Sequence, residues 1–233
     1  MSAGLDERLA AVWRQAAERG DPMPGESSLA ADLDSSRPAV REALVRLEER
    51  GYVRRRKGAD TVVNPSLLDI PARFDRQVDK VELIEATGRR AEVEVLAADA
   101  SPVTTEESTR FRIAPGTEVF RVRKLWRADG AAVMLAEDCV PIRTGATPDP
   151  ARSVFHTARE VAGEQPEWEV AWPSADAAVA AGAHELGLPV GAPVLVVDLS
   201  GVGRSGAVAY WSHELHVPGA LRYAVVRSVG GRP

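Results

Sequence analysis

The segment from Ser36 to Gly51 constrains the fold of this chain more than any other. Ser36 is a suitable N-cap, and Pro38 falls in the first turn of a helix, where its missing N–H costs little. The apolar residues that follow recur with the spacing of a single helix face, at Val40, Ala43, Leu44 and Leu47. Gly51 can end the helix. We therefore predict a helix from Ser36 to about Arg50 whose apolar stripe faces a core.

The flanking segments predict two more helices and a hairpin. One helix runs from about Leu5 to Gly20, and a shorter one covers residues 26–33. Residues 52–56 and 61–63 favour strands, and the four residues between them are typical of a hairpin turn. Helix, helix, turn, helix and hairpin is the order of a winged helix-turn-helix. In that fold the third helix enters the major groove of DNA and the hairpin lies along the backbone.

The net charge of −5 conceals a local basic stripe. Residues 37–57 hold eight Lys or Arg and three Asp or Glu, a net charge of +5. Residues 1–65 sum to zero, so residues 66–233 carry the whole acidic excess. This division favours a DNA-reading head joined to an acidic second domain.

Several other classes of protein are excluded. No apolar run is long enough to span a membrane, and residues 1–20 are too acidic for a signal peptide, so we expect a cytoplasmic protein with no membrane partner. The single cysteine, Cys139, excludes an internal disulfide framework and every multi-cysteine metal site. We expect neither a metal nor another cofactor.

The rest of the chain predicts a linker at residues 66–80 and one α+β domain at residues 81–233. Alternating or β-prone runs predict strands at 91–98, 118–127, 133–140, 193–202 and 207–217. Helices are expected at 104–110, 153–162 and 175–186. Asp129-Gly130 is a strong hairpin signal between the second and third of these strands. Antiparallel strands flanked by a few helices are typical of the α+β class.

The first 65 residues resemble the DNA-binding domain of the GntR family of bacterial transcription regulators. The motifs that carry the resemblance are Pro24-Gly25-Glu26-Ser27, Ser36-Arg37-Pro38-Ala39-Val40-Arg41, Leu47-Glu48-Glu49-Arg50-Gly51 and Gly58-Ala59-Asp60. The resemblance implies DNA contacts from the second helix, the third helix and the hairpin, at Glu26, Ser27, Ser36, Arg37, Pro38, Ala39, Arg41, Arg54, Arg55, Arg56, Lys57 and Gly58.

Three places depart from the family pattern. Ser27 stands where the family usually has arginine, and Asp60 replaces a glycine of the hairpin. Pro38 and Ala39 stand where hydroxylated residues are common. Fewer polar groups then face the bases, although Pro38 and Ala39 can still contact thymine methyls and Arg41 remains. We therefore expect an operator preference different from that of typical members.

The second domain resembles UTRA, the ligand-sensing domain of the HutC-like branch of this family, whose fold is related to chorismate lyase. The matching segments are 119–126 before Asp129-Gly130, 183–195, and the strand through Tyr210. The resemblance implies a pocket for a small-molecule effector, with candidate residues Lys124, Trp126, Glu137, Tyr210, Ser212 and Glu214.

Lys124 and Trp126 occupy the positions at which relatives that bind phosphorylated sugars carry an Arg-x-Arg pair. The period-2 pattern puts both on one face of a strand. A lysine with a tryptophan suits a carboxylate or an aromatic ligand better than a phosphate held by two hydrogen bonds. In the alternative interpretation, Trp126 belongs to the core and Lys124 extends past it.

Two other patterns do not indicate sites. Residues 201–206 match G-x-G-x-x-G, but a β-prone run follows them, so we expect a hairpin loop rather than a nucleotide site. His213 and His216 lack the spacing of a zinc motif, and on a strand they would point to opposite faces.

Together these features predict a homodimeric transcription regulator, expected to be a repressor, that binds a palindromic double-stranded DNA operator and responds to a small effector. The alternative is a lyase-like enzyme with a fused DNA-binding head, acting on a small aromatic or carboxylic acid. No nucleophile motif, metal cluster or close acid pair favours the enzyme. A DNA-architectural protein is a third interpretation, but it leaves the second domain without a task.

Overall fold

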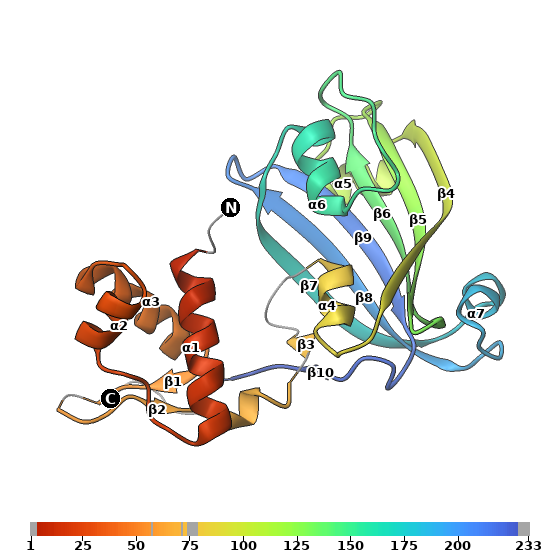
Figure 1. The fold of residues 1–233 in the computed structure, drawn as a ribbon. Helices are drawn as coiled ribbons and strands as arrows, with labels where there is room; N and C mark the ends of the chain where they lie inside the picture. The colour runs from red at the N-terminus through yellow and green to blue at the C-terminus, as the bar shows by residue number, and fades with distance from the viewer. Residues whose placement is uncertain (1–3, 57, 71, 74–78, 228–233) are drawn as a thin grey trace. The chain divides into compact units, whose positions relative to one another are not determined.

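The computed structural model describes residues 4–56, 58–70, 72–73 and 79–227, and the chain forms two compact units (Figure 1). Unit 1 comprises residues 1–76 and 223–233, and unit 2 comprises residues 77–222. The chain therefore crosses between the units twice, and unit 2 is an insertion in unit 1. This division differs from the sequence-based one, which assigned everything from residue 81 onward to the second domain.

Unit 1 contains a three-helix head and a two-stranded wing. Its first elements are α1 (Leu5–Arg19), α2 (Glu26–Asp32), α3 (Arg37–Glu49), β1 (Val53–Arg54), β2 (Val62–Val63) and the 3-10 turn η1 (Pro65–Leu67). Strand β1 pairs with β2 in antiparallel register, as the hairpin prediction requires. Helix α3 also has its predicted ends. Ser36 accepts a hydrogen bond from the Ala39 amide, and Gly51 adopts a φ of 77°, a left-handed conformation that glycine tolerates.

The apolar stripe of α3 forms the centre of the head core. It is buried against Leu9 and Trp13 of α1 and Leu29 of α2. The Trp13 indole N–H also donates a 2.8 Å hydrogen bond to the carbonyl of Tyr52. Helix α1 therefore packs against α3 and is also hydrogen-bonded to the residue that precedes β1.

A second small sheet brings two distant segments together in unit 1. Strand β3 (Ala72–Arg73) pairs in parallel with β10 (Tyr223–Ala224). The Arg73 guanidinium donates a 2.9 Å hydrogen bond to the carbonyl of Arg50, at the end of α3. Two residues beyond β10, Val226 packs against the head core. Residues 223–226 are thus part of the head.

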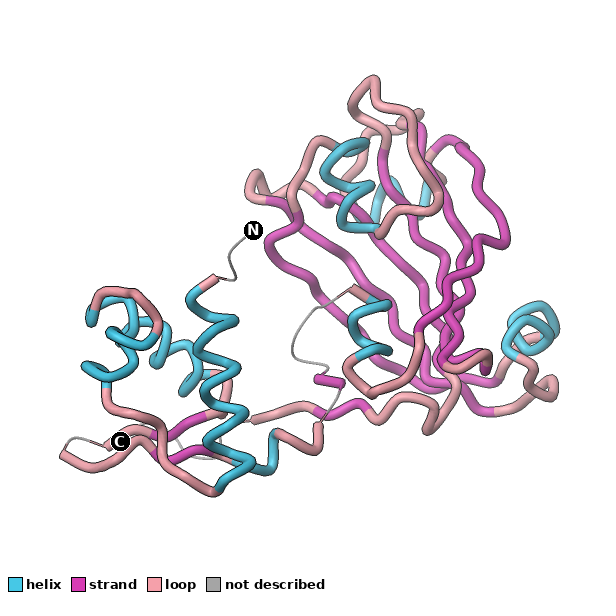
Figure 2. Tube along the Cα trace, in the orientation of Figure 1, coloured by secondary structure: helices cyan, strands magenta, loops and turns pink. Residues whose placement is uncertain are grey.

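Unit 2 is built on a six-stranded antiparallel sheet with the order β4-β5-β6-β9-β8-β7 (Figures 1 and 2). Its strands are β4 (Ala91–Pro102), β5 (Glu118–Ala128), β6 (Ala131–Pro141), β7 (Pro166–Ala177), β8 (Pro193–Gly203) and β9 (Val208–His216). Its helices are α4 (Lys80–Glu85), α5 (Thr105–Phe111), α6 (Val154–Thr157) with its π-helical continuation η2 (Ala158–Ala162), and α7 (Ala180–Leu186). The α+β prediction is confirmed.

One predicted helix is partly wrong. Residues 175–177, predicted to begin a helix, end strand β7, and α7 begins only at Ala180. Strand β7 was not among the predicted strands, although Trp168, Val170 and Trp172 alternate with other residues at the period of a strand. Alanine favours helices and is depleted in strands, so local propensity predicts a helix from Ala175, but pairing with β8 overrides it as far as Ala177.

The two faces of the sheet carry different helices. Helices α4 and α6 cover the face onto which Lys124 and Asp138 project, which we call the inner face. Helices α5 and α7 cover the opposite, outer face, which carries Glu137 and Cys139. The inner face holds a cavity lined by several charged side chains.

Candidate functional site

The exposed side of α3 is the candidate DNA-reading surface. Arg37, Pro38 and Arg41 are exposed, and Ala39 is half-buried. At 100° per residue they lie away from the buried stripe. The predicted contacts of α2, Glu26 and Ser27, stand at its first two positions, and Ser36 is the N-cap of α3.

Two of these predicted contacts bind each other. Arg41 donates to the Glu26 carboxylate from Nε at 3.1 Å and from Nη2 at 2.7 Å. These hydrogen bonds lower the pKa of the Glu26 carboxyl. The pair orients the guanidinium between α2 and α3, so a base contact by Arg41 requires Glu26 to share or release it.

Two other arginines of the basic stripe have structural partners. Arg46 binds Asp6 of α1, with nitrogen–oxygen distances of 2.5 and 3.0 Å. Arg55 donates to Glu48 of α3 from its backbone N–H at 2.8 Å and from Nε at 3.0 Å. Arg55 therefore fastens the wing to the recognition helix, a role that the sequence does not indicate.

The wing leaves two arginines in solvent. Arg54 and Arg56 are exposed, and so is Gly58 at the turn. Lys57 lies outside the described residues. Exposed arginines on a hairpin next to a recognition helix can contact the phosphate backbone, which positions a protein on DNA without reading sequence.

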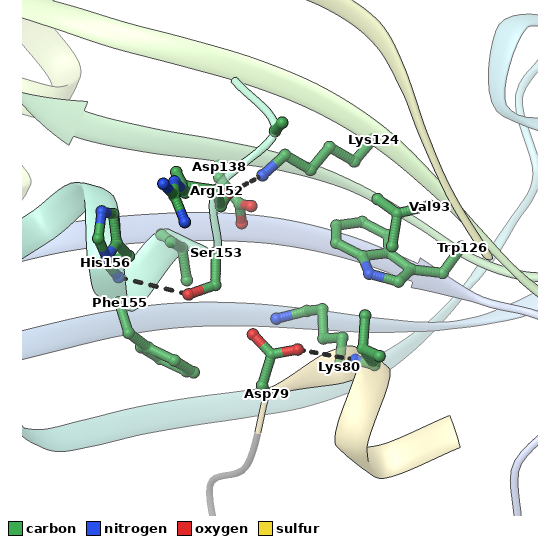
Figure 3. Close-up of a pocket in the computed structure, with 13 residues that line it drawn as sticks. Asp79, Lys80, Val93, Lys124, Trp126, Asp138, Arg152, Ser153, Phe155 and His156 are labelled. Carbon is green, nitrogen blue, oxygen red and sulfur yellow. Dashed lines mark hydrogen bonds between the residues drawn. The ribbon is translucent and has the colours of Figure 1, made fainter. Parts of the chain in front are cut away.

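A cavity of about 310 Å³ lies on the inner face of unit 2 (Figure 3). Residues of α4, β4, β5, β6 and the segment 151–156 line it. Its charged or titratable lining residues are Asp79, Lys80, Lys124, Asp138, Arg152 and His156. Of the six predicted effector residues, Lys124 and Trp126 line this cavity directly.

Lys124 is a buried charge at the cavity wall. Its side chain is 3% exposed, and its ammonium donates to the carbonyl of Arg152. No ion pair to Lys124 occurs among the described residues. Burial lowers the pKa of Lys124. An ammonium has three N–H donors, so two remain for a ligand.

Lys80 enters the cavity from α4, opposite Lys124 (Figure 3). Its ammonium lies 2.6 Å from a Glu214 oxygen and 5.9 Å from the centre of the Trp126 ring. The His216 ring bonds the other Glu214 oxygen at 2.9 Å. Burial opposes the charge of Glu214, but Lys80 and His216 lower its pKa to about 2. Burial likewise opposes the charge of Lys80, yet Glu214 and Asp138 raise its pKa.

Trp126 is both a core residue and a part of the cavity wall, so the two interpretations of its role are compatible. It is only 5% exposed, as a core residue would be. It also forms part of the cavity wall beside Lys80 and Val93 (Figure 3). A ligand ring in the cavity would therefore meet a fixed indole.

Tyr210 and Ser212 lie behind the lining. The Tyr210 hydroxyl donates to Glu169, and its ring packs edge-on against Phe155 with centroids 5.8 Å apart. The Ser212 hydroxyl donates to Asp138 at 2.7 Å, and burial raises the pKa of Asp138. Like Glu214, these residues hold the lining side chains in place.

Glu137 does not lie in the cavity. A register shift between Trp126 and Arg127 inserts one extra residue in β6 opposite β5. A regular two-residue hairpin would pair Val122 with Glu137, but the bulge pairs Val122 with Asp138. A one-residue shift exchanges the faces of a strand, so Asp138 reaches the inner face and Glu137 the outer face.

Five charged or titratable lining residues were not among the predicted ones: Asp79, Lys80, Asp138, Arg152 and His156. Lys80 stands at the end of the predicted linker, and Arg152 lies in a loop, so neither carries a local signal. Asp138 stands next to the predicted Glu137, so the sequence indicates an acidic residue near this position. Only the bulge decides which of the two carboxylates faces the cavity.

Three other kinds of feature bear on function: a metal site, a membrane-spanning helix and a nucleotide-binding loop. In the ranges that the structure describes, no three His, Cys, Asp or Glu side chains are grouped so as to hold a metal ion. No helix of those ranges is long and apolar enough to cross a membrane. In the G-x-G-x-x-G segment, residues 201–203 end β8 and residues 204–206 form the turn toward β9, so the predicted hairpin loop holds for its second half.

Two family models match the chain. Residues 8–63 match the model for bacterial regulatory proteins of the gntR family, and residues 86–222 match the UTRA domain. The Probable transcriptional regulator PhnF of Escherichia coli (strain K12) is 28% identical over 137 residues, which are 59% of this chain and 54% of that protein. An HTH-type transcriptional regulator of Rhizobium meliloti (strain 1021), RB1450, is 28% identical over 144 residues, 56% of this chain and 58% of that protein. The chain thus matches somewhat over half the length of these curated relatives.

Solved structures share the fold. PhnF from Mycobacterium smegmatis is 21% identical, with a TM-score of 0.61 over 97% of this chain and 100% of that one. The possible transcriptional regulator YydK from Bacillus subtilis is 17% identical, with a TM-score of 0.75 over 97% of this chain and 99% of that one. Because the UTRA model alone spans more than half of the chain and the gntR model matches the head, the chain belongs to the GntR family of bacterial regulatory proteins, in the HutC-like branch that carries a UTRA domain.

Proposed function

We propose that this chain is a transcription regulator whose operator affinity is controlled by a small anionic molecule bound in unit 2. The observation that carries the proposal is Lys124, a buried ammonium with one carbonyl partner at a cavity wall. Asp138 attracts this ammonium without forming an ion pair with it, so the cost of burying the charge is only partly offset, and an anionic ligand would relieve the remainder. The family of the head, and the names of the relatives as transcriptional regulators, support the DNA-binding half.

The head is suited to acting in pairs. It offers a short recognition helix with few polar groups toward the bases, and residues 1–65 carry no net charge. One such head should bind weakly and with strong salt dependence, whereas two linked heads gain from each other. We therefore propose a homodimer that recognises two half-sites of a palindromic operator and represses transcription there.

The cavity is suited to a carboxylate attached to a flat or apolar group. Lys124 offers unfilled donors, and the Trp126 indole forms a wall nearby. Asp138 offers an acceptor for a hydroxyl or amino group of the ligand. The cavity has no pair of adjacent arginines on β5, so a phosphate would lack the fork-shaped contacts that favour it.

Lys80 provides a physical route from the cavity to the head. Asp79 and Lys80 follow the segment that joins unit 1 to unit 2, and both line the cavity. An anion in the cavity would compete with Glu214 for Lys80 and so shift the start of α4. The ligand lowers the affinity of the dimer for its operator if it binds more tightly to the arrangement in which the two heads do not fit two successive half-sites.

The test uses the full chain and the DNA upstream of its own gene. Binding of a labelled duplex is followed by fluorescence anisotropy at one salt concentration, with a scrambled duplex as control. A panel of aliphatic and aromatic carboxylates is then added, each beside the corresponding neutral alcohol. We expect preference for the upstream duplex, and its release by a carboxylate but not by the alcohol.

Three outcomes would contradict the proposal. Equal affinity for both duplexes would contradict sequence-specific binding. Release by the neutral compounds alone would contradict an anionic effector. Chemical conversion of a panel compound, detected by chromatography after incubation, would support the lyase-like enzyme instead.

A further inference from the structure

Strand β7 presents an exposed aromatic row on the outer face of the sheet. Trp168, Val170 and Trp172 are 73%, 45% and 47% exposed, and they share one face because they alternate along the strand. The residue between the first two, Glu169, turns to the inner face and bonds Tyr210. Two tryptophans and a valine expose roughly 300 Å² of apolar surface, a size at which the largest patch of a monomer is often functional.

The row has an internal symmetry. Val170 stands at its centre, with a tryptophan two residues away on either side. If a second β7 approaches in the antiparallel direction about a two-fold axis at Val170, each Trp168 meets a Trp172 and the two valines meet each other. A two-fold interface must be self-complementary in this way, and the centre of this row carries no charge that would repel its own copy.

The surroundings of the row are also complementary under that axis. At the Trp172 end, a groove of about 260 Å³ lies between α5 and the sheet, and its lining includes the acidic residues Glu106, Glu107, Glu137 and Asp198. The lining also includes Arg110, whose guanidinium lies 5.9 Å from the centre of the Trp172 ring, so the groove is acidic on balance. At the Trp168 end, Arg204 forms an ion pair of 2.7 Å with Glu167, and its side chain is 88% exposed. The two-fold operation brings the arginine of each copy toward the acidic groove of the other.

The edge position of β7 adds a further reason. Within the described residues β7 pairs only with β8, so its other side is a free strand edge. Natural proteins usually protect such an edge by charge, brevity or a cover. This edge strand contains Pro173 and several acidic residues, which discourage pairing along the edge itself, so a partner would cover the apolar side chains of its outer face.

We propose that the outer face of β7 is the surface through which two copies of this chain associate, about a two-fold axis at Val170. This inference rests on the proposed homodimer and specifies where the two copies meet. The row itself buries only part of the roughly 800 Å² that each partner of a stable complex contributes, and the neighbouring groove supplies the additional contact.

The first experiment introduces like charges on the row. The double variant Trp168→Glu with Trp172→Glu is compared with Val179→Glu plus Val190→Glu, which alters two residues that are 70% and 72% exposed beside α7. Sedimentation at micromolar concentration should show wild type and the control pair as dimers and the tryptophan pair as monomers. Thermal unfolding checks that each variant is folded.

The second experiment tests the axis and does not depend on that variant folding. Val170→Cys should be joined to its own copy by a short bis-maleimide, because residues on a two-fold axis face themselves across the roughly 10 Å between packed sheets, whereas Val190→Cys should not. The native thiol, Cys139, is buried, and burial raises its pKa to about 12, so it should not contribute.

The outcomes separate this interface from the proposed function. Monomeric wild type at these concentrations would overturn both the homodimer and the interface. Dimeric wild type, with a dimeric tryptophan pair and no Val170→Cys cross-link, would overturn the interface and leave the regulator intact. If the Val190→Cys variant binds the operator as a dimer and also cross-links, the two copies meet beside α7. That result would contradict the interface proposed at Trp168, Val170 and Trp172.

Discussion

At Lys124, the stability of the fold and the proposed binding of an anion make opposite demands. The ammonium is buried beside a carbonyl, and burial lowers its pKa. Lys124→Met keeps the length of the side chain and removes the charge. We expect the ligand-free protein to gain about 1 kcal/mol of unfolding free energy, because replacing a buried charge by an apolar group is often stabilising.

The same variant should no longer respond to any carboxylate that releases wild type from the operator. Calorimetry measures the first effect and anisotropy the second. Lys124→Arg is the matched control, since it keeps the charge and should keep part of the response. A less stable Lys124→Met protein that still responds would contradict the assigned role.

The Glu214 carboxylate should make the free energy of unfolding depend on pH. Its pKa is about 2 in the folded chain, below the value of about 4.3 in an unfolded one. A depressed carboxyl pKa contributes stability that is fully present above the unfolded value and is lost as the pH falls toward 2. We expect Glu214→Gln to lose about 3 kcal/mol at pH 7, and the difference from wild type to shrink between pH 5 and pH 2.

Calorimetry of the full chain at several pH values measures this difference. Glu94→Gln is the matched control, because the exposed Glu94 lies 3.5 Å from Arg127 and should change stability little at any pH. A wild-type advantage over Glu214→Gln that stays constant down to pH 2 would show that the Glu214 carboxylate is not the titrating group.

On the head, two arginines of α3 offer a clean comparison. Arg41 is exposed and bound to Glu26, whereas Arg46 is bound to Asp6 of α1. Arg41→Ala should lower operator affinity roughly ten- to a hundredfold at fixed salt, the range for losing a base contact. Arg46→Ala should affect the stability of the head more than its affinity for DNA. Unchanged operator affinity in Arg41→Ala would show that α3 does not read bases through this residue.

At the scale of elements, the structure explains why some predictions held and one residue fell on the wrong face. Helix α3 was predictable because its stripe, its cap at Ser36 and its end at Gly51 are local signals that agree. The face of Glu137 was not predictable, because a single bulge in the β5–β6 hairpin decides it. Such bulges depend on packing across the whole sheet and leave no marker in the strand itself.

The return of the chain to the head gives a prediction for one short segment. Val226 packs on the head core next to Gly51, whereas its neighbour Val225 is 57% exposed. Val226→Asp should destabilise the head by about 2 kcal/mol, since it places a carboxylate against apolar side chains. Val225→Asp is the control and should have almost no effect.

Hydrogen exchange localises the effect. Val226→Asp should accelerate exchange in α1 and α3 and leave unit 2 unchanged. If exchange accelerates in unit 2 instead, or if Val225→Asp behaves in the same way, residues 223–226 do not support the head.

At the scale of the whole molecule, the sequence is sufficient for the two-part plan and for the class of each part. The cavity was only partly accessible from sequence. Lys124 and Trp126 share one strand, so their spacing places them together, but Lys80 and Arg152 reach them through long-range folding. The boundary between the units was hidden for the same reason, because strand β10 is two residues long and belongs to a sheet whose other strand lies about 150 residues earlier.

The insertion of unit 2 within unit 1 has a consequence for synthesis on the ribosome. Domains usually fold in the order in which they emerge, with the N-terminal one first. Here the head is incomplete until residues 223–226 have been made, which requires all of unit 2 to precede them. A nascent or truncated chain would then carry a weakened head, and a chain whose unit 2 fails to fold must close a long flexible loop before β10 can reach β3. A chain whose unit 2 is damaged should therefore also have a less stable head, because residues 223–226 reach the head only after unit 2.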